Sequence, residues 1–228
     1  MSALPAHRTI AAVVFDFGGV IRPGSPAGAG PESPYAALEG EFGLPDGFLW
    51  RAVYLENPAW LDLRVGQGTE ADWLAATAEA IQPLIGVARA AALLDQLEEA
   101  QPREKRFRDR PVEFNPGMIE LVESLRPRYR VSILSNAAPG LEAELAEHYR
   151  IAHLFHDIVN SATVGVAKPD LRIYRLAAQR LDVAIESCFF TDDLAHNIEA
   201  ARAAGMVGHL FDGVAGLREA LAAAGVKA

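Results

Sequence analysis

The chain has 228 residues, of which 50% are apolar and 22% are charged. This composition supports a packed core, in one large domain or in one domain with a smaller partner, and excludes wholesale disorder, a collagen-like fibre and a coiled coil. Acidic residues outnumber basic ones by 30 to 21, and the net charge of −9 makes binding to a nucleic-acid backbone unfavourable.

The sequence shows no targeting segment, membrane span or disulfide framework. The apolar run at residues 10–15 is too short for a signal-peptide core, and no uncharged stretch approaches the roughly 18 residues of a membrane-spanning helix. Cys188 is the only cysteine, so no intrachain disulfide can form. We therefore expect a reduced, cytoplasmic protein that binds neither a membrane nor nucleic acid.

The first predicted element is a buried strand at residues 10–15, because this run is continuously apolar and rich in β-branched residues. Asp16 ends the strand, and Gly18 and Gly19 follow closely. Residues 22–34 contain four prolines and three glycines, which predicts a linker without helix or strand.

From residue 35 to residue 104 the apolar residues recur at helical spacing, which predicts an all-helical segment. It contains all three tryptophans, Trp50, Trp60 and Trp73, which we expect to form its core rather than to line a pocket.

Beyond residue 110 the predicted strands and helices alternate. Strands are expected at residues 130–134, 157–160, 188–190 and 207–211, with helices near 116–125, 141–148, 169–181, 193–204 and from 217 onward. We expect Asn115 to cap the first of these helices. This alternation predicts an α/β fold with a doubly wound parallel sheet. Its core would be discontinuous, residues 1–21 and 111–228, with a helical insert at 22–110.

Polar residues lie at or just beyond the carboxyl ends of the predicted strands, where open α/β sheets bind their ligands. They are Asp16, Ser135, Asn136, Lys168, Asp192 and Asp193.

The carboxylates among these residues have specific chemical uses and less specific alternatives. Asp16 can act as a nucleophile or metal ligand, although an isolated aspartate there can also cap a turn. Asp192 and Asp193 are like charges side by side, which favours a bound cation such as Mg²⁺, unless one of them only caps the next helix. Asn197 is four residues after Asp193, so we expect it to orient Asp193 by a hydrogen bond.

The other polar residues can bind anions. Lys168 can neutralise a carboxylate or a phosphoryl oxygen, although most single lysines are only solvated surface. Ser135 and Asn136 can offer a hydroxyl, an amide and backbone N–H groups to an oxyanion, or they form an ordinary turn. Arg22, with Arg51 and Arg64 in the helical segment, could reach an anionic substrate.

Taken in order, four short segments resemble the four motifs of the haloacid dehalogenase-like superfamily. They are VFDFGGV at 14–20, ILSN at 133–136, AKPD at 167–170 and FTDDLAHN at 190–197. The resemblance covers nearly the whole core. It implies a Rossmann-like core with a mobile helical cap, the insert at 22–110.

The resemblance also implies a role for each matched residue. Asp16 matches the nucleophile, which forms an aspartyl-phosphate in the phosphatases of the family. Ser135 and Asn136 match the motif that binds the transferring group, and Lys168 matches the lysine of the third motif.

The acidic pair Asp192 and Asp193 matches the residues that bind Mg²⁺ directly or through water, and we favour Asp193 as the direct ligand. Gly18 departs from the family pattern, which usually has a second aspartate as general acid and base there. The Gly18 carbonyl could still ligate the metal, but it has no proton to give. Loss of general acid–base catalysis typically lowers the reaction rate by ~100- to 10,000-fold.

Three functions follow from these features. The first is a Mg²⁺-dependent phosphatase that acts on a small phosphorylated metabolite. The second is a metal-free 2-haloacid dehalogenase, although that class tends to have Ser and Asn at the positions of Asp192 and Asp193. The third is a catalytically impaired homologue that acts as a binding or regulatory protein, for which Gly18 is the only support.

Overall fold

The structure, a computed structural model, describes residues 9–23, 35–100 and 112–227. Most of the expected linker and the expected boundary near residue 110 lie outside the described residues. The chain divides into two compact units, Met1–Pro23 with Glu113–Ala228 and Gly24–Val112. We call the first the core unit and the second the helical unit.

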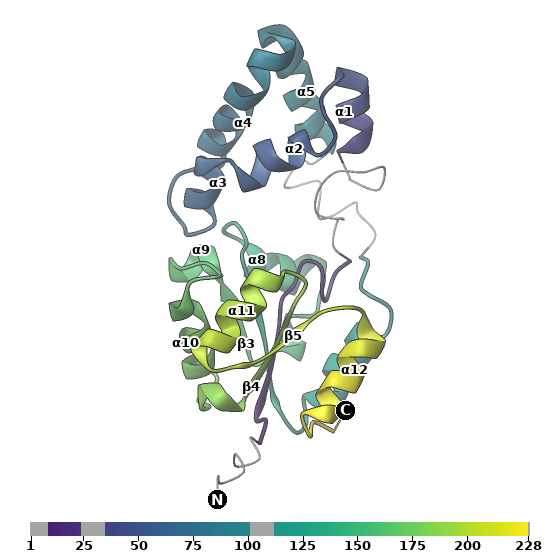
Figure 1. Ribbon diagram of the computed structural model, residues 1–228, viewed down its shortest axis with the longest axis vertical. Helices are drawn as coiled ribbons and strands as arrows, with labels where there is room; N and C mark the ends of the chain where they lie inside the picture. The colour runs from purple at the N-terminus through teal and green to yellow at the C-terminus, as the bar shows by residue number, and fades with distance from the viewer. Residues whose placement is uncertain (1–8, 24–34, 101–111, 228) are drawn as a thin grey trace, which may run out of the picture. The chain divides into compact units, whose positions relative to one another are not determined.

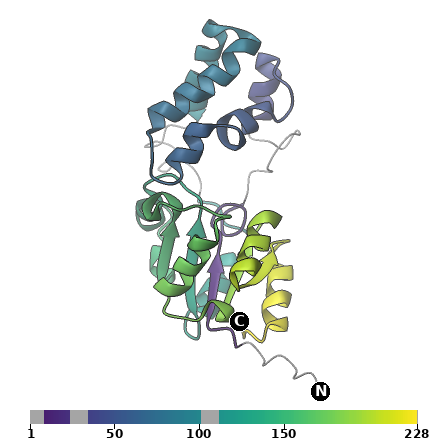
Figure 2. The same cartoon turned by 60° about the vertical axis from the view of Figure 1, so that its left-hand side comes forward.

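The core unit contains a parallel five-stranded sheet in the order β3-β2-β1-β4-β5. Its strands are β1 Ala12–Phe15, β2 Arg130–Ser135, β3 Asp157–Asn160, β4 Cys188–Asp192 and β5 Val207–Leu210. The central strand, β1, is purple in Figures 1 and 2. After β1 the chain adds β2 and β3 on one side of β1, and then returns to add β4 and β5 on the other side. The sheet therefore has a topological switch point between β1 and β4. The predicted doubly wound, Rossmann-like sheet is confirmed.

Helices cover both faces of this sheet (Figure 1). The longer ones are α7 Met118–Leu125, α10 Leu171–Arg180, α11 Ala195–Ala204 and α12 Val214–Ala223. Val13 and Phe15 pack with α7 and α12, whereas Ala12 and Val14 pack with α10 and α11. Because both faces of β1 are buried, its sequence is continuously apolar rather than alternating. Cys188 lies in the second layer, where burial raises the pKa of its thiol to about 12.

Short helical turns complete the core unit. They are α8 Leu141–Ala143, η2 Glu144–His148, η3 Ala152–Leu154, α9 Ser161–Val164 and η4 Ile185–Ser187.

Three helices, α7, α10 and α11, begin about two residues later than predicted. Asn115 does not cap α7, which starts at Met118 after Gly117 in the left-handed conformation, with φ of 77°. The Asn115 side chain instead donates to the carbonyl of Val20 at 2.7 Å, and its backbone N–H donates to Ile21 at 2.9 Å. Asn115 therefore ties the returning chain to the loop after β1. Similarly, α10 begins at Leu171, because Asp170 caps its first turn by accepting from the N–H of Arg172.

The described part of the helical unit consists of helices and connecting turns, as the spacing predicts. The helices are α1 Ala36–Phe42, α2 Phe48–Trp50, η1 Arg51–Leu55, α3 Pro58–Leu63, α4 Glu70–Ile85 and α5 Val87–Ala100. Trp73 is buried as predicted, and its indole N–H donates to Val53 at 2.6 Å, whereas Trp50 and Trp60 are half-buried. In the described ranges, no helix has the length and apolar character needed to cross a bilayer. A cytoplasmic location stays a prediction.

Glu39 organises the start of α2 from inside the helical unit. It is only 1% exposed, and its two carboxylate oxygens accept from the N–H groups of Gly47 at 2.9 Å and Leu49 at 2.8 Å. These N–H groups belong to the first turn of α2, where a helix has no partners of its own. A negative charge there also interacts favourably with the helix dipole.

We expect Glu39→Ala to lower the free energy of unfolding by about 2–4 kcal/mol, because two buried N–H groups lose a charged acceptor. Glu79→Ala, at an exposed position of α4, should change it by less than about 0.5 kcal/mol. Urea unfolding followed by tryptophan fluorescence measures both changes, since all three tryptophans lie in this unit. Equal losses in the two variants would show that Glu39 does not stabilise α2.

Candidate active site

The carboxyl ends of β1 and β4 bring two carboxylates to one buried ammonium. Asp16 directly follows β1, Asp192 is the last residue of β4, and Lys168 lies in the turn before α10. Lys168 Nζ lies 2.9 Å from Asp16 Oδ1 and 2.6 Å from Asp192 Oδ2. All three residues are buried. These ion pairs therefore form where water screens charge weakly.

Lys168 keeps its positive charge in this environment. Burial alone would lower the pKa of its ammonium, but the negative charges of Asp16 and Asp192 outweigh burial and hold the pKa above its ordinary value. The ammonium also lies 5.5 Å from the centre of the Phe190 ring, whose face attracts a cation.

Asp16 has one occupied and one available oxygen. Oδ1 accepts from the N–H of Phe17 at 2.7 Å as well as from Lys168. Among the described residues none donates a hydrogen bond to Oδ2. Burial raises the pKa of Asp16 and the charge of Asp192 raises it further, whereas Lys168 opposes both. A second cation beside Asp16 would favour its ionised form.

Hydrogen bonds occupy both carboxylate oxygens of Asp192. Oδ1 accepts from the N–H of Leu194 at 2.9 Å, and Oδ2 accepts from Lys168. The side chain of Asn197 donates to both oxygens, at 3.0 and 3.1 Å. Our prediction that Asn197 orients Asp193 is therefore wrong. Because α11 begins only at Ala195, Asp193 lies before the helix and shares no helical face with Asn197.

Asp193 is the exposed member of the acidic pair, and its carboxylate lies against the backbone of Gly19. A Cβ atom at position 19 would collide with this carboxylate, and Gly19 has a left-handed φ of 86°. Position 19 therefore requires glycine. Burial of the Asp193 carboxyl raises its pKa, and the charge of Asp192 adds to this effect.

Together Asp16, Asp192 and Asp193 form an acidic cluster that fits a hard cation. Each offers one oxygen, and these oxygens all lie within 4.8 Å of one another. Lys168 supplies one positive charge to three carboxylates, which leaves an excess of negative charge when all are ionised. Oxygen ligands of this kind suit Mg²⁺.

The predicted anion-binding residues Ser135 and Asn136 lie in two different environments. Ser135 ends β2 and is 5% exposed, and in the described ranges no group forms a hydrogen bond with its hydroxyl. The Asn136 amide, which we expected to face an oxyanion, instead binds the backbone of Lys168.

Gly18, unlike Gly19, has space around it. A Cβ atom at position 18 would meet no other atom within 4 Å, and its φ lies outside the left-handed region. A side chain could therefore start at position 18 without a Cβ clash and without a left-handed backbone.

Two of the three arginines that we considered as anion ligands have other described contacts, whereas Arg64 Nε is buried and has no hydrogen-bond partner among the described residues. Arg22 forms a β-bridge with Gly18 and donates to the hydroxyl of Tyr149 at 3.0 Å. Arg51 and Arg64 belong to the helical unit, where Arg51 lies 3.6 Å from Glu56.

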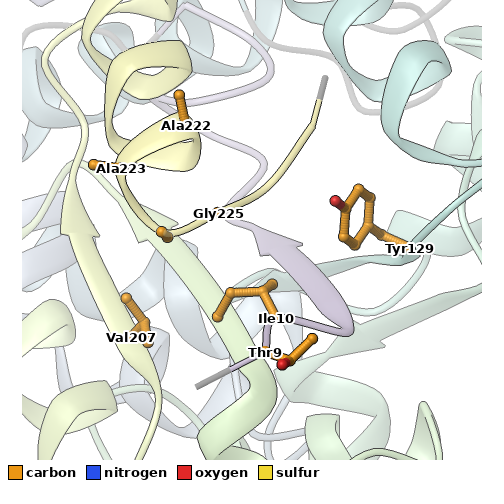
Figure 3. Close-up of a pocket in the computed structure, with 8 residues that line it drawn as sticks. Thr9, Ile10, Tyr129, Val207, Ala222, Ala223 and Gly225 are labelled. Carbon is orange, nitrogen blue, oxygen red and sulfur yellow. The ribbon is translucent and has the colours of Figure 1, made fainter. Parts of the chain in front are cut away.

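A cavity of about 600 Å³ lies at the opposite edge of the core unit, before the amino ends of β1 and β5. Figure 3 shows Thr9, Ile10 and Tyr129 beside Val207 and the end of α12. Apolar side chains and backbone form most of this lining, and it contains no carboxylate, lysine or histidine. It therefore offers none of the chemistry found at the carboxyl edge.

Residues 10–205 match the model of a family described as a hydrolase, haloacid dehalogenase-like. A phosphatase of Mycobacterium tuberculosis (strain CDC 1551 / Oshkosh) is 38% identical over 93 residues, which cover 40% of this chain and 43% of that protein. A fructose-1-phosphate phosphatase of Escherichia coli (strain K12) is 28% identical over 168 residues, 71% of this chain and 89% of that protein. The chain spans less than half the length of several curated relatives that it matches.

Two solved structures show the same fold at low sequence identity. A hydrolase of this family from Porphyromonas gingivalis has a TM-score of 0.60 at 20% identity, covering 93% of this chain and 98% of that chain. The L-2-haloacid dehalogenase of Xanthobacter autotrophicus, with chloropropionic acid covalently bound, has a TM-score of 0.57 at 17% identity, covering 96% and 85%. The fold is thus found with more than one chemistry.

We expect Lys168→Met to lower the free energy of unfolding in EDTA by about 3–5 kcal/mol, because it leaves two buried carboxylates without their cation. Arg180→Met is a matched control, since it removes a partly exposed ion pair of 2.6 Å with Asp157 and should cost less than about 1 kcal/mol. Urea unfolding at pH 8 measures both. A loss no larger than that of the control would contradict a central role for the ammonium.

Proposed function

The chain belongs to the haloacid dehalogenase-like hydrolases, and we propose that it is a Mg²⁺-dependent phosphatase of a small phosphorylated metabolite. The observation that carries this proposal is the cluster of three carboxylates beside one buried ammonium. The phosphatase names of the curated relatives support it.

The proposed metal ligands are Asp16, Asp193 and the carbonyl of Gly18. Asp193 is favoured over Asp192 as the direct ligand, because four hydrogen bonds already occupy the oxygens of Asp192. Bound Mg²⁺ would neutralise charge on the carboxylates and on the phosphate. Asp192 then acts mainly by orienting Lys168.

The proposed reaction has two displacements at phosphorus. Asp16 Oδ2 attacks the phosphorus atom, a phosphorus–oxygen bond forms, and the ester bond to the leaving alcohol breaks. Water then attacks the phosphorus of the aspartyl-phosphate and releases phosphate and the Asp16 carboxylate. Lys168 holds Asp16 through Oδ1. In this proposal the Ser135 hydroxyl donates to a phosphoryl oxygen. With glycine at position 18, the leaving oxygen takes its proton from water.

We also propose that the helical unit serves as a cap over the substrate. The chain leaves the core unit after Pro23 and returns at Glu113. Asn115, on the returning segment, binds Val20 and Ile21 on the departing one. The two connecting segments therefore lie together at the loop that follows Asp16. An insert at this position is suited to control access to the carboxyl edge of the sheet and to contribute to substrate specificity.

The dehalogenase remains the second candidate because a dehalogenase shares the fold. A metal-free reaction has little use for an excess of buried negative charge, which favours the phosphatase. The third candidate, an impaired homologue, has only Gly18 in its support.

We expect phosphate release from a panel of small phosphate esters in Mg²⁺, loss of release in EDTA, and a rate below about one-thousandth in Asp16→Asn, because the nucleophile is removed. Released phosphate measured against time provides the comparison. Chloride release from 2-chloropropionate that EDTA does not affect would instead identify a dehalogenase.

We expect the wild-type rate to depend steeply on the leaving group, because position 18 provides no general acid. Gly18→Asp should raise turnover of alkyl phosphates by about 10- to 100-fold and change turnover of an aryl phosphate with a good leaving group much less. Gly18→Asn is the matched control, since its amide has similar size but cannot act as a carboxylic acid.

An equal gain in Gly18→Asn and Gly18→Asp would show that volume, not proton transfer, matters at this position. If the wild type releases no phosphate and only Gly18→Asp does, the chain is an impaired homologue.

A further inference from the structure

Lys168 reaches the site from a turn outside the sheet, so its position depends on the contacts that hold this turn. The side chain of Asn136 supplies two of them. Nδ2 donates to the Lys168 carbonyl at 2.8 Å, and Oδ1 accepts from the Lys168 N–H at 2.8 Å. Both main-chain polar groups of Lys168 are thereby bound to one side chain.

A carboxamide is suited to this contact because it offers a donor and an acceptor side by side, as a neighbouring β-strand would. Aspartate could only accept, and alanine could do neither. Asn136 directly follows β2, so the two bonds connect the turn that carries Lys168 to the rigid sheet.

We propose that Asn136 is a positioning residue that fixes the Lys168 ammonium between Asp16 and Asp192 by clamping the Lys168 backbone. In this proposal the Asn136 amide serves the Lys168 backbone, and Ser135 is the substrate-facing side chain of the pair. The kinetic part of this inference rests on the proposed phosphatase function, whereas the structural part is independent of it.

Chemical labelling of lysine tests the structural part without any assay of activity. The chain has only three lysines, Lys105, Lys168 and Lys227, so mass spectrometry can follow each one after treatment with a succinimidyl ester. In the wild type, Lys168 is 2% exposed and should be labelled far more slowly than the exposed Lys227. In Asn136→Ala we expect Lys168 labelling to accelerate at least about tenfold, because the turn opens locally.

Two controls separate this local change from general unfolding. Asn160→Ala removes another buried asparagine, which ends the neighbouring strand β3 and binds Ala138 and Ala162 without touching Lys168. It should leave Lys168 protected. The Cys188 thiol, buried in β4, should stay unreactive toward a disulfide reagent in both variants. If Asn136→Ala does not fold, Asn136→Asp decides the question, because it keeps one of the two bonds and should give intermediate labelling.

Steady-state kinetics with p-nitrophenyl phosphate and Mg²⁺ test the catalytic part. We expect Asn136→Ala to lower kcat by about 10- to 100-fold and to change KM little, because a misplaced ammonium weakens the reaction more than binding. Ser135→Ala should mainly raise KM. A rise in KM without a fall in kcat in Asn136→Ala would make Asn136 a substrate ligand and overturn the proposal.

Unchanged protection of Lys168 in the folded Asn136→Ala variant would also overturn it. Accelerated labelling in a protein that releases no phosphate would retain the clamp and reject only the proposed function.

Discussion

The buried ammonium of Lys168 is the interaction on which the rest of this site depends. Asp16 and Asp192 leave neighbouring strands in the same direction, so a parallel sheet necessarily places their charges close together. Without a cation between them, burial and mutual repulsion would favour protonation of one carboxyl group. Lys168 opposes this effect at Asp16, where burial still raises the pKa to about 7, and ionised Asp16 is the form that can act as a nucleophile.

A buried ion triad of this kind is a poor way to stabilise a fold, because desolvation of the charges offsets much of their attraction. The supporting contacts show how the fold holds it. Asn136 fixes the Lys168 backbone, Asn197 fixes Asp192, and the hydroxyl of Tyr174 donates to the Asn197 carbonyl at 2.9 Å. Lys168 and Asp192 are thus each held by an asparagine on a different element, whereas Asp16 is bound by Lys168 and by the N–H of Phe17. Such layered support is typical of sites built for chemistry.

The sequence predicts the fold well because its signals are local. The predicted strand at residues 157–160 coincides with β3, and Gly205 ends α11 in the left-handed conformation, as a glycine after a helix should. The partner of Asn197 could not be predicted in the same way. A shift of the helix start by two residues changes which carboxylate it reaches, and sequence patterns locate helix ends only to within a few residues. The clamp by Asn136 left no local signal, since it joins residues 32 positions apart.

The two glycines after Asp16 differ in what the structure demands of them. Gly19 is required, because its backbone is left-handed and any Cβ there would displace the Asp193 carboxylate. Gly18 is not required, because its backbone suits any residue and the space beside it is open. Neither packing nor backbone geometry therefore accounts for the absence of a carboxylate at position 18. A side chain there would lie two residues from Asp16, so Gly18 bears on the proposed chemistry of the site and not on the packing of the fold.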